Sequence, residues 1–226
     1  KEQKKYPEAE LIYEKAINLF GKSSVLSYSL GSIFSSQNLF AKSLPHYNES
    51  ISLDKKNKYA LNNKGVALKE LGKYDEAIKS LNDAISVDNN FSQANFNLGY
   101  IMLLVNFNSE GWIKYESREH ANNNKKKELD KLGIKKWNCS DLKDKSIIIY
   151  SEQGIGDAVQ FSRYIKLIKK DNTRIIFYSN KNLKYLFGKL EEVDEIIYDL
   201  KNLYYADFFI SLMSLPYIFR KIKIIP

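Results

Sequence analysis

The stretch SEQGIGDAVQFSRY, residues 151–164, follows the apolar run at residues 147–150 and leads into apolar positions that recur from Val159 to Ile168. The uninterrupted apolar run predicts a buried strand, and the recurrence at helical spacing predicts a helix. Between them, we expect Gly154 and Gly156 to take positive φ, which glycine adopts without steric cost. The stretch therefore predicts a strand, a tight glycine turn and a helix.

The mouth of this turn is a candidate binding site because it joins the carboxyl end of a strand to the unpaired amides of a helix N-terminus. Asp157 lies in this mouth and has two interpretations. Aspartate is a common helix cap, and it is also a carboxylate that can act on a bound molecule. A dinucleotide site is not predicted, because position 159 is Val where the third glycine of that motif would fall.

The composition indicates a folded protein of one or two domains. The 226 residues are 44% hydrophobic and 13% aromatic, which is ample for a packed core. The net charge of +8 is dispersed: residues 1–120 carry 15 Lys/Arg against 14 Asp/Glu, residues 121–146 carry 8 against 4, and residues 147–226 carry 12 against 9. Half of the excess lies in one short segment and does not mark a basic face, so we expect no nucleic-acid partner.

Cysteine, histidine and apolar runs limit the class of protein further. The single Cys139 excludes an internal disulfide and fits a reducing compartment. Together with His46 and His120 it forms no metal-ligand spacing, so we expect no metal site. The apolar runs are too short for a transmembrane segment and the N-terminus has no signal-peptide pattern, so we expect a cytoplasmic protein. The chain begins at Lys1 within a repeat, and we expect it to be a fragment.

Residues 58–91 have the length and pattern of a helix-turn-helix repeat, and a shift of 34 residues in either direction recovers the same register. The aligned columns are Tyr6, Phe40 and Tyr74; Ala9, Ser43 and Ala77; Ala16, Ser50 and Ala84; and Gly31, Gly65 and Gly99. The chain resembles tetratricopeptide repeat proteins over residues 1–120, as a half repeat followed by three repeats, the last of them atypical. This resemblance implies an α-solenoid of seven antiparallel helices with the small residues buried between them.

The same resemblance implies a concave groove, lined by the first helix of each repeat, that often holds an extended peptide. Ser29, Asn63 and Asn97 occupy the equivalent groove-facing position in three repeats. A carboxamide there can hold a peptide backbone through its C=O and its N–H groups. The alternative is that Asn is simply the common residue at this position of the repeat. The expected partner is a protein or peptide.

After residues 121–146, which we expect to form a linker with Trp137 docked on a neighbouring element, strand and helix patterns alternate to the end of the chain. The expected strands are 147–150, 174–178, 195–198 and 207–210, and the expected helices are 158–169, 183–190 and a short one around Pro216. Alternation of this kind predicts an α/β domain with a parallel sheet and crossover helices.

Five sequence landmarks occur in a fixed order: GWIKYESR at 111–118, Trp137, the stretch at 151–164, EEVDEII at 191–197 and SLMSLP at 211–216. This set resembles bacterial proteins that join tetratricopeptide repeats to a glycosyltransferase domain. That domain is similar to the heptosyltransferases of glycosyltransferase family 9. The resemblance implies that residues 147–226 are the Rossmann-like N-terminal part of a GT-B domain, truncated here.

In heptosyltransferases, the Gly-Asp after the first strand carries the carboxylate proposed as general base on the acceptor hydroxyl, and it matches Gly156 and Asp157. The other residues that the resemblance implies in acceptor or phosphate binding are Gln153, Gly154, Ile155, Gln160 and Arg163. The nucleotide of the donor binds mainly to the C-terminal half of such enzymes. We therefore expect no cofactor in this chain, and a nucleotide sugar donor only in the full-length protein.

Two functions follow from these expectations. In the first, the repeats recruit a protein partner and the α/β part presents a hydroxyl acceptor for sugar transfer. In the second, the chain is a non-catalytic protein-binding scaffold whose α/β part is a degenerate relative of the enzyme. The intact run from Glu152 to Asp157 favours the enzyme.

Overall fold

The computed structural model describes residues 5–106, 109–120, 124–152, 154–169, 172–183, 187–188 and 190–220. The chain divides into two compact units, Lys1–Arg118 and Glu119–Pro226.

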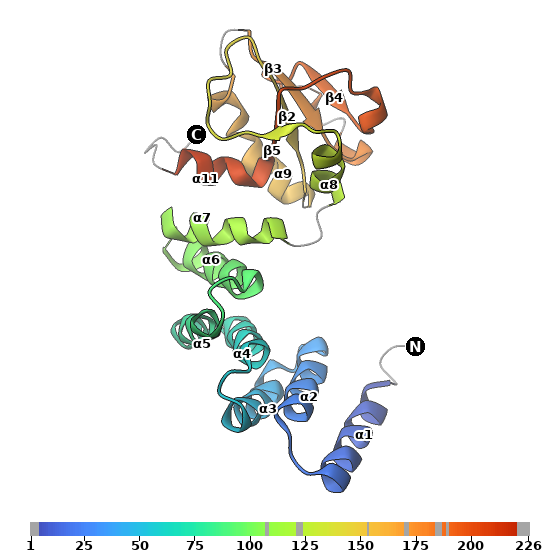
Figure 1. Ribbon diagram of the computed structural model, residues 1–226, viewed down its shortest axis with the longest axis vertical. Helices are drawn as coiled ribbons and strands as arrows, with labels where there is room; N and C mark the ends of the chain where they lie inside the picture. Colours follow the sequence, from blue (N-terminus) through green and yellow to red (C-terminus); the bar gives the residue numbers. More distant parts are fainter. Residues whose placement is uncertain are drawn as a thin grey trace. The chain divides into compact units, whose positions relative to one another are not determined.

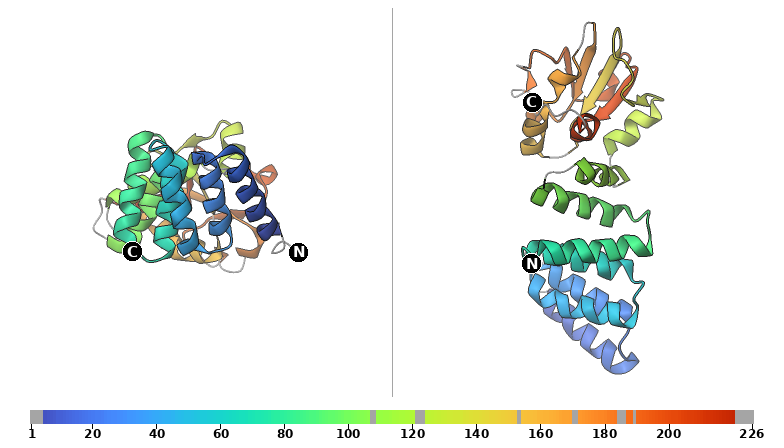
Figure 2. Two further views of the ribbon diagram at one scale, coloured as in Figure 1. Left: turned by 90° about the horizontal axis from the view of Figure 1, so that it is seen from below. Right: turned by 90° about the vertical axis from the view of Figure 1, so that its left-hand side faces the viewer.

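The first unit is a stack of helices, which can be followed in order in Figure 1. The helices are α1 (Lys5–Phe20), α2 (Ser24–Ser36), α3 (Phe40–Leu53), α4 (Lys58–Glu70), α5 (Tyr74–Val87), α6 (Ser92–Asn106) and α7 (Ser109–Tyr115), and a 3₁₀ turn follows at Glu116–His120. Consecutive helices pack against one another and lie side by side in both views of Figure 2. Within the described residues, the seven helices expected before residue 120 are confirmed.

The small residues of the repeat pattern are the contact points of this stack. Ala77 and Ala84 are fully buried, and the three glycines that align at 34-residue spacing are buried as well. A Cβ atom placed on Gly65 would lie 2.7 Å from Leu81 Cγ, and one on Gly99 would lie 2.5 Å from the backbone nitrogen of Tyr115. The helices therefore approach more closely at these glycines than a larger side chain allows without a shift of its neighbours, which confirms the predicted register.

The second unit is built on a five-stranded sheet whose neighbouring strands all run parallel, as the alternating pattern predicts. The strands are β1 (Lys135–Lys136), β2 (Ser146–Tyr150), β3 (Arg174–Tyr178), β4 (Glu195–Ile197) and β5 (Phe208–Ser211). Their order across the sheet is β1-β5-β2-β3-β4. From β2, the chain adds β3 and β4 on one side, and it then returns to place β5 on the other side of β2.

Helices and apolar side chains cover both faces of this sheet. The helices are α8 (Asn124–Lys131), α9 (Ile155–Ser162) and α11 (Leu215–Phe219), and 3₁₀ turns lie at Ile165–Leu167, Lys181–Leu183, Leu200–Asn202 and Leu212–Ser214. On one face, Leu129 of α8 joins Ile148 and Ile176 in a buried cluster. Side chains of a strand alternate between faces, so Phe177, which stacks on Phe187 with ring centroids 4.4 Å apart, belongs to the opposite face.

The segment expected as a linker, 121–146, differs from the expectation because it contributes α8 and β1 to the second unit. Leu129, Trp137 and Leu142 are buried, and the Trp137 Nε1–H donates to the carbonyl oxygen of Ser140 at 2.9 Å. α8 contributes Leu129 to the core, and Trp137 and Leu142 come from the segment between β1 and β2. A polar sequence with isolated apolar residues has no periodicity from which these elements could be predicted.

The glycine turn also differs from the expectation. Gly154 is the N-cap of α9 with φ −64°, and Gly156 lies within the helix. Among the described residues, the glycines with positive φ are Gly21, Gly72 and Gly133. The prediction of positive φ at Gly154 and Gly156 is therefore wrong, because the chain enters the helix from an extended conformation and does not reverse through a left-handed one.

Candidate functional sites: an asparagine network and the carboxyl edge of the sheet

Three asparagines on the first helices of two repeats form a hydrogen-bonded network, which we call the asparagine network: Asn62, Asn63 and Asn97. Asn62 of α4 is 1% exposed. Its Nδ2–H donates to Asn63 Oδ1 at 3.0 Å, and its Oδ1 accepts from Asn97 Nδ2 of α6 at 2.9 Å. The buried Asn62 thus orients the two half-buried asparagines that the sequence predicts to face the groove.

The outer amides of this network keep hydrogen-bonding capacity. The Nδ2 of Asn63 makes only long contacts, 3.4 Å to the Tyr28 hydroxyl and 3.5 Å to Ser32 Oγ, both on α2. An amide Nδ2 carries two N–H groups, so Asn97 retains one after its bond to Asn62. Ser29, the third predicted residue, is half-buried on α2. The three side chains therefore lie on successive first helices, as expected.

Aromatic rings and paired charges surround the asparagine network. Tyr59 lies between Tyr28 and Phe91, with ring centroids 6.4 Å and 5.4 Å away. Lys58 Nζ bonds Asp88 at 2.6 Å, and this hydrogen bond lowers the pKa of the Asp88 carboxyl. Further along the same face, Lys69 pairs with Glu70 at 2.5 Å and lies 5.0 Å from the ring centroid of Tyr100. The lysines named here are thus already matched by carboxylates.

The second candidate site is the carboxyl edge of the sheet, where β2 and β5 end side by side. Ser151 directly follows β2, and Ser211 closes β5. The Ser211 hydroxyl hydrogen-bonds the Glu152 carboxylate. Asp157 lies in the first turn of α9 and lines a small recess with Ser151 and Glu152. Because the strand order reverses at β2, this edge is where ligands of open parallel sheets usually bind.

The two interpretations of Asp157 can be compared with this geometry. The helix begins at Ile155 and its N-cap is Gly154, which has no side chain to bond the helix amides. Asp157 therefore does not occupy the N-cap position. A Cβ atom on Gly154 or Gly156 would meet nothing within 4 Å. Neither positive φ nor close packing within the described residues explains these two glycines.

A lysine from the segment expected as a linker reaches the same edge. Lys125 Nζ of α8 donates to the carbonyl oxygen of Ser151 at 2.8 Å, and burial lowers the pKa of this ammonium group. It also lies 4.9 Å from the ring centroid of Tyr178, at the end of β3. Burial, together with a hydrogen bond to Glu128, raises the pKa of Tyr178 to about 12, so this hydroxyl stays protonated at neutral pH.

The remaining predicted residues lie around the start and end of α9. Ile155 and Gln160 are exposed, and Gln153 lies outside the described residues. Arg163 is the C-cap of α9, and its guanidinium lies 5.6 Å from the ring centroid of Tyr164. The buried Arg163 Nε has no hydrogen-bond partner in the part of the chain that the structure describes.

Sequence reasoning missed Asn62, Lys125 and the role of Ser211. Asn62 stands next to Asn63 in the sequence, and no pattern distinguishes a buried asparagine from an exposed one. Lys125 belongs to a run of three lysines, any of which could have faced inward. Ser211 could have been found, because it follows an expected strand and the carboxyl ends of parallel strands meet at one edge.

Comparison with known proteins supports the assignment of the first unit. The tetratricopeptide repeat family model matches residues 59–91, which span most of α4 and α5. The first unit is a helical solenoid that contains this repeat. Among the described residues, no helix is long and apolar enough to cross a membrane, and no group of three or more His, Cys, Asp or Glu side chains could hold a metal ion.

Individual proteins similar to this chain are more distant. Protein FlbA of Caulobacter vibrioides is 26% identical over 161 residues, which are 70% of this chain and 27% of FlbA. The chain thus spans about a quarter of the length of that curated relative. The crystal structure of YrrB, described as a TPR protein with an unusual peptide-binding site, has a TM-score of 0.47 and 19% identity, covering 58% of this chain and 68% of YrrB. The second TPR of Spaghetti (RPAP3), bound to an HSP90 peptide, has a TM-score of 0.42 and 21% identity, covering 44% of this chain and 92% of that one.

Proposed function

We propose that this chain is a protein-binding scaffold that holds an extended segment of its partner along Ser29, Asn63 and Asn97. The observation that carries the proposal is the asparagine network. The buried Asn62 is hydrogen-bonded to both outer amides. The Nδ2 of Asn63 makes only long contacts, and one N–H group of Asn97 Nδ2 is left after its bond to Asn62. Polar groups held in a fixed orientation bind at lower entropic cost than mobile ones, because they lose less freedom on binding.

The chemistry of these side chains indicates what they recognise. An extended peptide presents a backbone C=O or N–H at regular intervals, and a carboxamide can bond either group. Backbone recognition tolerates different partner sequences, so selectivity would come from the neighbouring rings of Tyr28, Tyr59 and Tyr100. The nearby lysines are paired with carboxylates, so we expect the affinity to depend only weakly on salt.

The test compares two double variants that remove the same chemical groups from different helices. Asn63→Ala with Asn97→Ala removes the outer amides, and Asn48→Ala with Asn82→Ala is the matched control, because both control residues are exposed and lie on second helices of the repeats. Peptides are first selected against the wild-type chain from a displayed library, and their Kd values are then measured by fluorescence anisotropy.

We expect the groove variant to bind about ten-fold or more weakly, since two hydrogen bonds contribute about 0.5–1.5 kcal/mol each and 1.4 kcal/mol is ten-fold in affinity. The control variant should bind like the wild type. Thermal unfolding is measured on both variants to separate lost binding from lost folding. Unchanged affinity of a folded groove variant would remove these amides from the proposal.

A second function, sugar transfer in the full-length protein, is favoured by one observation on the second unit. Asp157 and the hydrogen bond between Glu152 and Ser211 lie at the edge of the sheet where the strand order reverses. Gly154 and Gly156 lie at the same edge, and neither backbone strain nor close packing requires glycine at these positions. We propose that this edge is the acceptor side of a Rossmann-like, GT-B-type domain. Asp157 would take the proton of an acceptor hydroxyl as the bond to the sugar of a nucleotide sugar forms.

This second proposal is tested with Asp157→Asn in the full-length protein. Asparagine keeps the size of the side chain and loses the base, so activity should fall about 10²- to 10⁴-fold. Asp157 does not cap α9, so the melting temperature should hardly change. A variant that retains full transferase activity would leave the scaffold as the function of this chain.

A further inference from the structure

An unassigned feature of the second unit is a pocket of about 530 Å³ at the amino ends of β1, β2 and β5. It lies between the turn that connects α8 to β1 and the segment that connects the 3₁₀ turn at Leu200–Asn202 to β5. All strands are parallel, so this end of the sheet is opposite to the one that holds Asp157. The volume falls within the range of about 300–1,000 Å³ that is typical of small-molecule sites.

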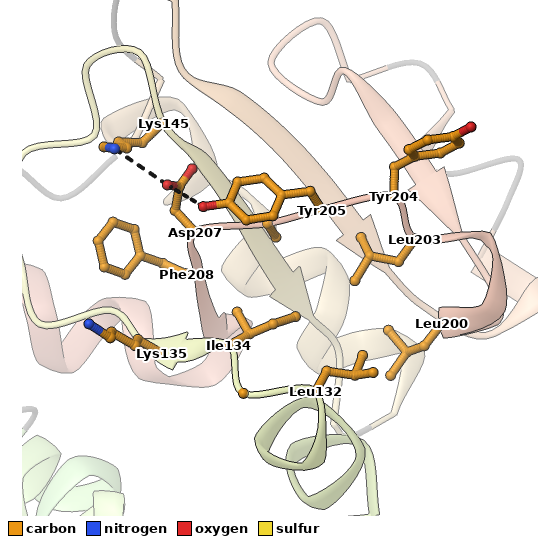
Figure 3. A pocket seen from close by; sticks show the side chains of 12 residues that line it. Leu132, Ile134, Lys135, Lys145, Leu200, Leu203, Tyr204, Tyr205, Asp207 and Phe208 are labelled. Carbon is orange, nitrogen blue, oxygen red and sulfur yellow. Dashed lines mark hydrogen bonds and ion pairs between the residues drawn. The ribbon is translucent and has the colours of Figure 1, made fainter.

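The lining of the pocket has an apolar side and a cationic side. Figure 3 shows Leu132, Leu200 and Leu203 on one side and the two lysines, Lys135 and Lys145, on the other. Leu132 is 54% exposed in spite of its place at the pocket wall. Apolar side chains that gather in a concavity and stay exposed indicate a surface that an apolar molecule can cover.

The two lysines differ in whether a carboxylate pairs with them. Lys145 Nζ lies 3.4 Å from Asp207 Oδ1, and the other oxygen of this carboxylate accepts from the backbone N–H and the hydroxyl of Ser146, both at 2.8 Å. Asp207 is therefore committed to holding β2 and β5 together. Lys135 makes no ion pair with any residue that the structure describes. The charged side chains at the wall, two lysines and one aspartate, therefore leave one positive charge unmatched.

Two aromatic side chains complete the rim. The Tyr205 hydroxyl donates to Asp207 Oδ1 at 2.9 Å, which holds this ring across the pocket. Tyr204 is 99% exposed, and its ring points away from the pocket in Figure 3. A flat ring such as that of Tyr205 at the mouth of an apolar pocket favours a flat ligand, because offset stacking adds to the burial of apolar area.

We propose that this pocket binds a small molecule with a flat or branched apolar body and one anionic group, such as a carboxylate or sulfonate. The body lies against the leucines and the ring of Tyr205, and the anion pairs with Lys135. Neither the repeat unit nor the carboxyl edge takes part in this site.

The proposal is tested with two probes that differ only in charge. 8-Anilinonaphthalene-1-sulfonate carries the anion, and N-phenyl-1-naphthylamine has the same rings without it. Both are titrated into the 226-residue chain by fluorescence. Amide NMR shifts locate the bound sulfonate, and we expect saturable binding with the shifts concentrated in residues 132–135 and 200–208.

Lys135→Gln is compared with Lys136→Gln, because adjacent residues of a strand point to opposite faces. An exposed ion pair contributes about 0.2–1 kcal/mol, so Lys135→Gln should weaken binding of the sulfonate by about 1.4- to 5-fold and leave binding of the neutral probe unchanged. Lys136→Gln should change neither probe. Leu203→Trp fills the apolar side and should abolish binding of both probes while circular dichroism retains the folded spectrum.

Two results would overturn the proposal. One is a set of NMR shifts centred outside residues 132–135 and 200–208. The other is an equal effect of the two lysine substitutions on the sulfonate, which would show that only net charge matters. The lysine comparison does not depend on the leucine substitution, so it decides the question even where Leu203→Trp weakens folding.

Discussion

Replacing Gly99 with alanine should destabilise the repeat unit much more than replacing Gly65, although the two glycines occupy the same position in successive repeats. A Cβ on Gly65 would lie 2.7 Å from Leu81 Cγ, which belongs to a side chain that can shift. A Cβ on Gly99 would lie 2.5 Å from the backbone nitrogen of Tyr115 and 2.8 Å from the carbonyl oxygen of Gly111. Relief of that contact requires α6 and α7 to move apart.

Two opposing effects set the magnitude. Overpacking a close contact costs about 1–3 kcal/mol, and a Gly-to-Ala change inside a helix gains about 1 kcal/mol of helix propensity. For Gly99 the contact is with backbone, so we take the upper end of the cost and expect a net loss of about 2 kcal/mol. For Gly65 the closest contact is with a side chain, so we take the lower end of the cost, about 1 kcal/mol, and the gain in helix propensity nearly cancels it.

The assay is thermal unfolding of the whole chain, followed by circular dichroism at a wavelength that reports helix. A loss of 1 kcal/mol lowers the melting temperature of a domain of 60–100 residues by about 4–8 °C, so Gly99→Ala should lower it by about 8–16 °C. Gly65→Ala should change it by only a few degrees. An equal fall for both variants would refute the reasoning, because it would mean that the identity of the contacting atom does not matter.

Three further predictions concern single residues. Hydrogen bonds and Lys145, opposed by burial, lower the pKa of Asp207 from 3.8 to about 2, so its stabilisation is present above pH 4 and is lost as the pH falls towards 2. Asp207→Asn should remove about 2 kcal/mol of this pH dependence, measured by urea unfolding at several pH values. Asn62→Ala removes both hydrogen bonds of the buried Asn62 side chain and should lower the free energy of unfolding, measured with urea, by about 1–3 kcal/mol, whereas Asn82→Ala, at an exposed position, should be neutral. Gly156→Ala meets no atom within 4 Å and should raise stability by about 0.4–1 kcal/mol, and a lower melting temperature would contradict the open environment of this glycine.

The repeat unit was predictable because its contacts are local and periodic. A 34-residue spacing of small residues can place Gly31, Gly65 and Gly99 at helix crossings only if each repeat packs in the same way as the one before it. The parallel sheet followed from uninterrupted apolar runs, which need cover on both faces. The conformation of the glycine turn did not follow, because glycine permits both signs of φ and the path of the entering chain selects one.

The sequence by itself determined the helices of the repeats, strands β2 to β5, the register of the repeats, and the position of Asp157 after the carboxyl end of a strand, but it did not determine α8 and β1. The tertiary structure alone decided which side chains meet. It brought Lys125 to Ser151, joined Asn62 to Asn97 across two repeats, and formed the pocket beside Lys135. The reason is that these groupings join residues far apart in the chain, and local periodicity carries no information about partners that only the packing of whole elements brings together.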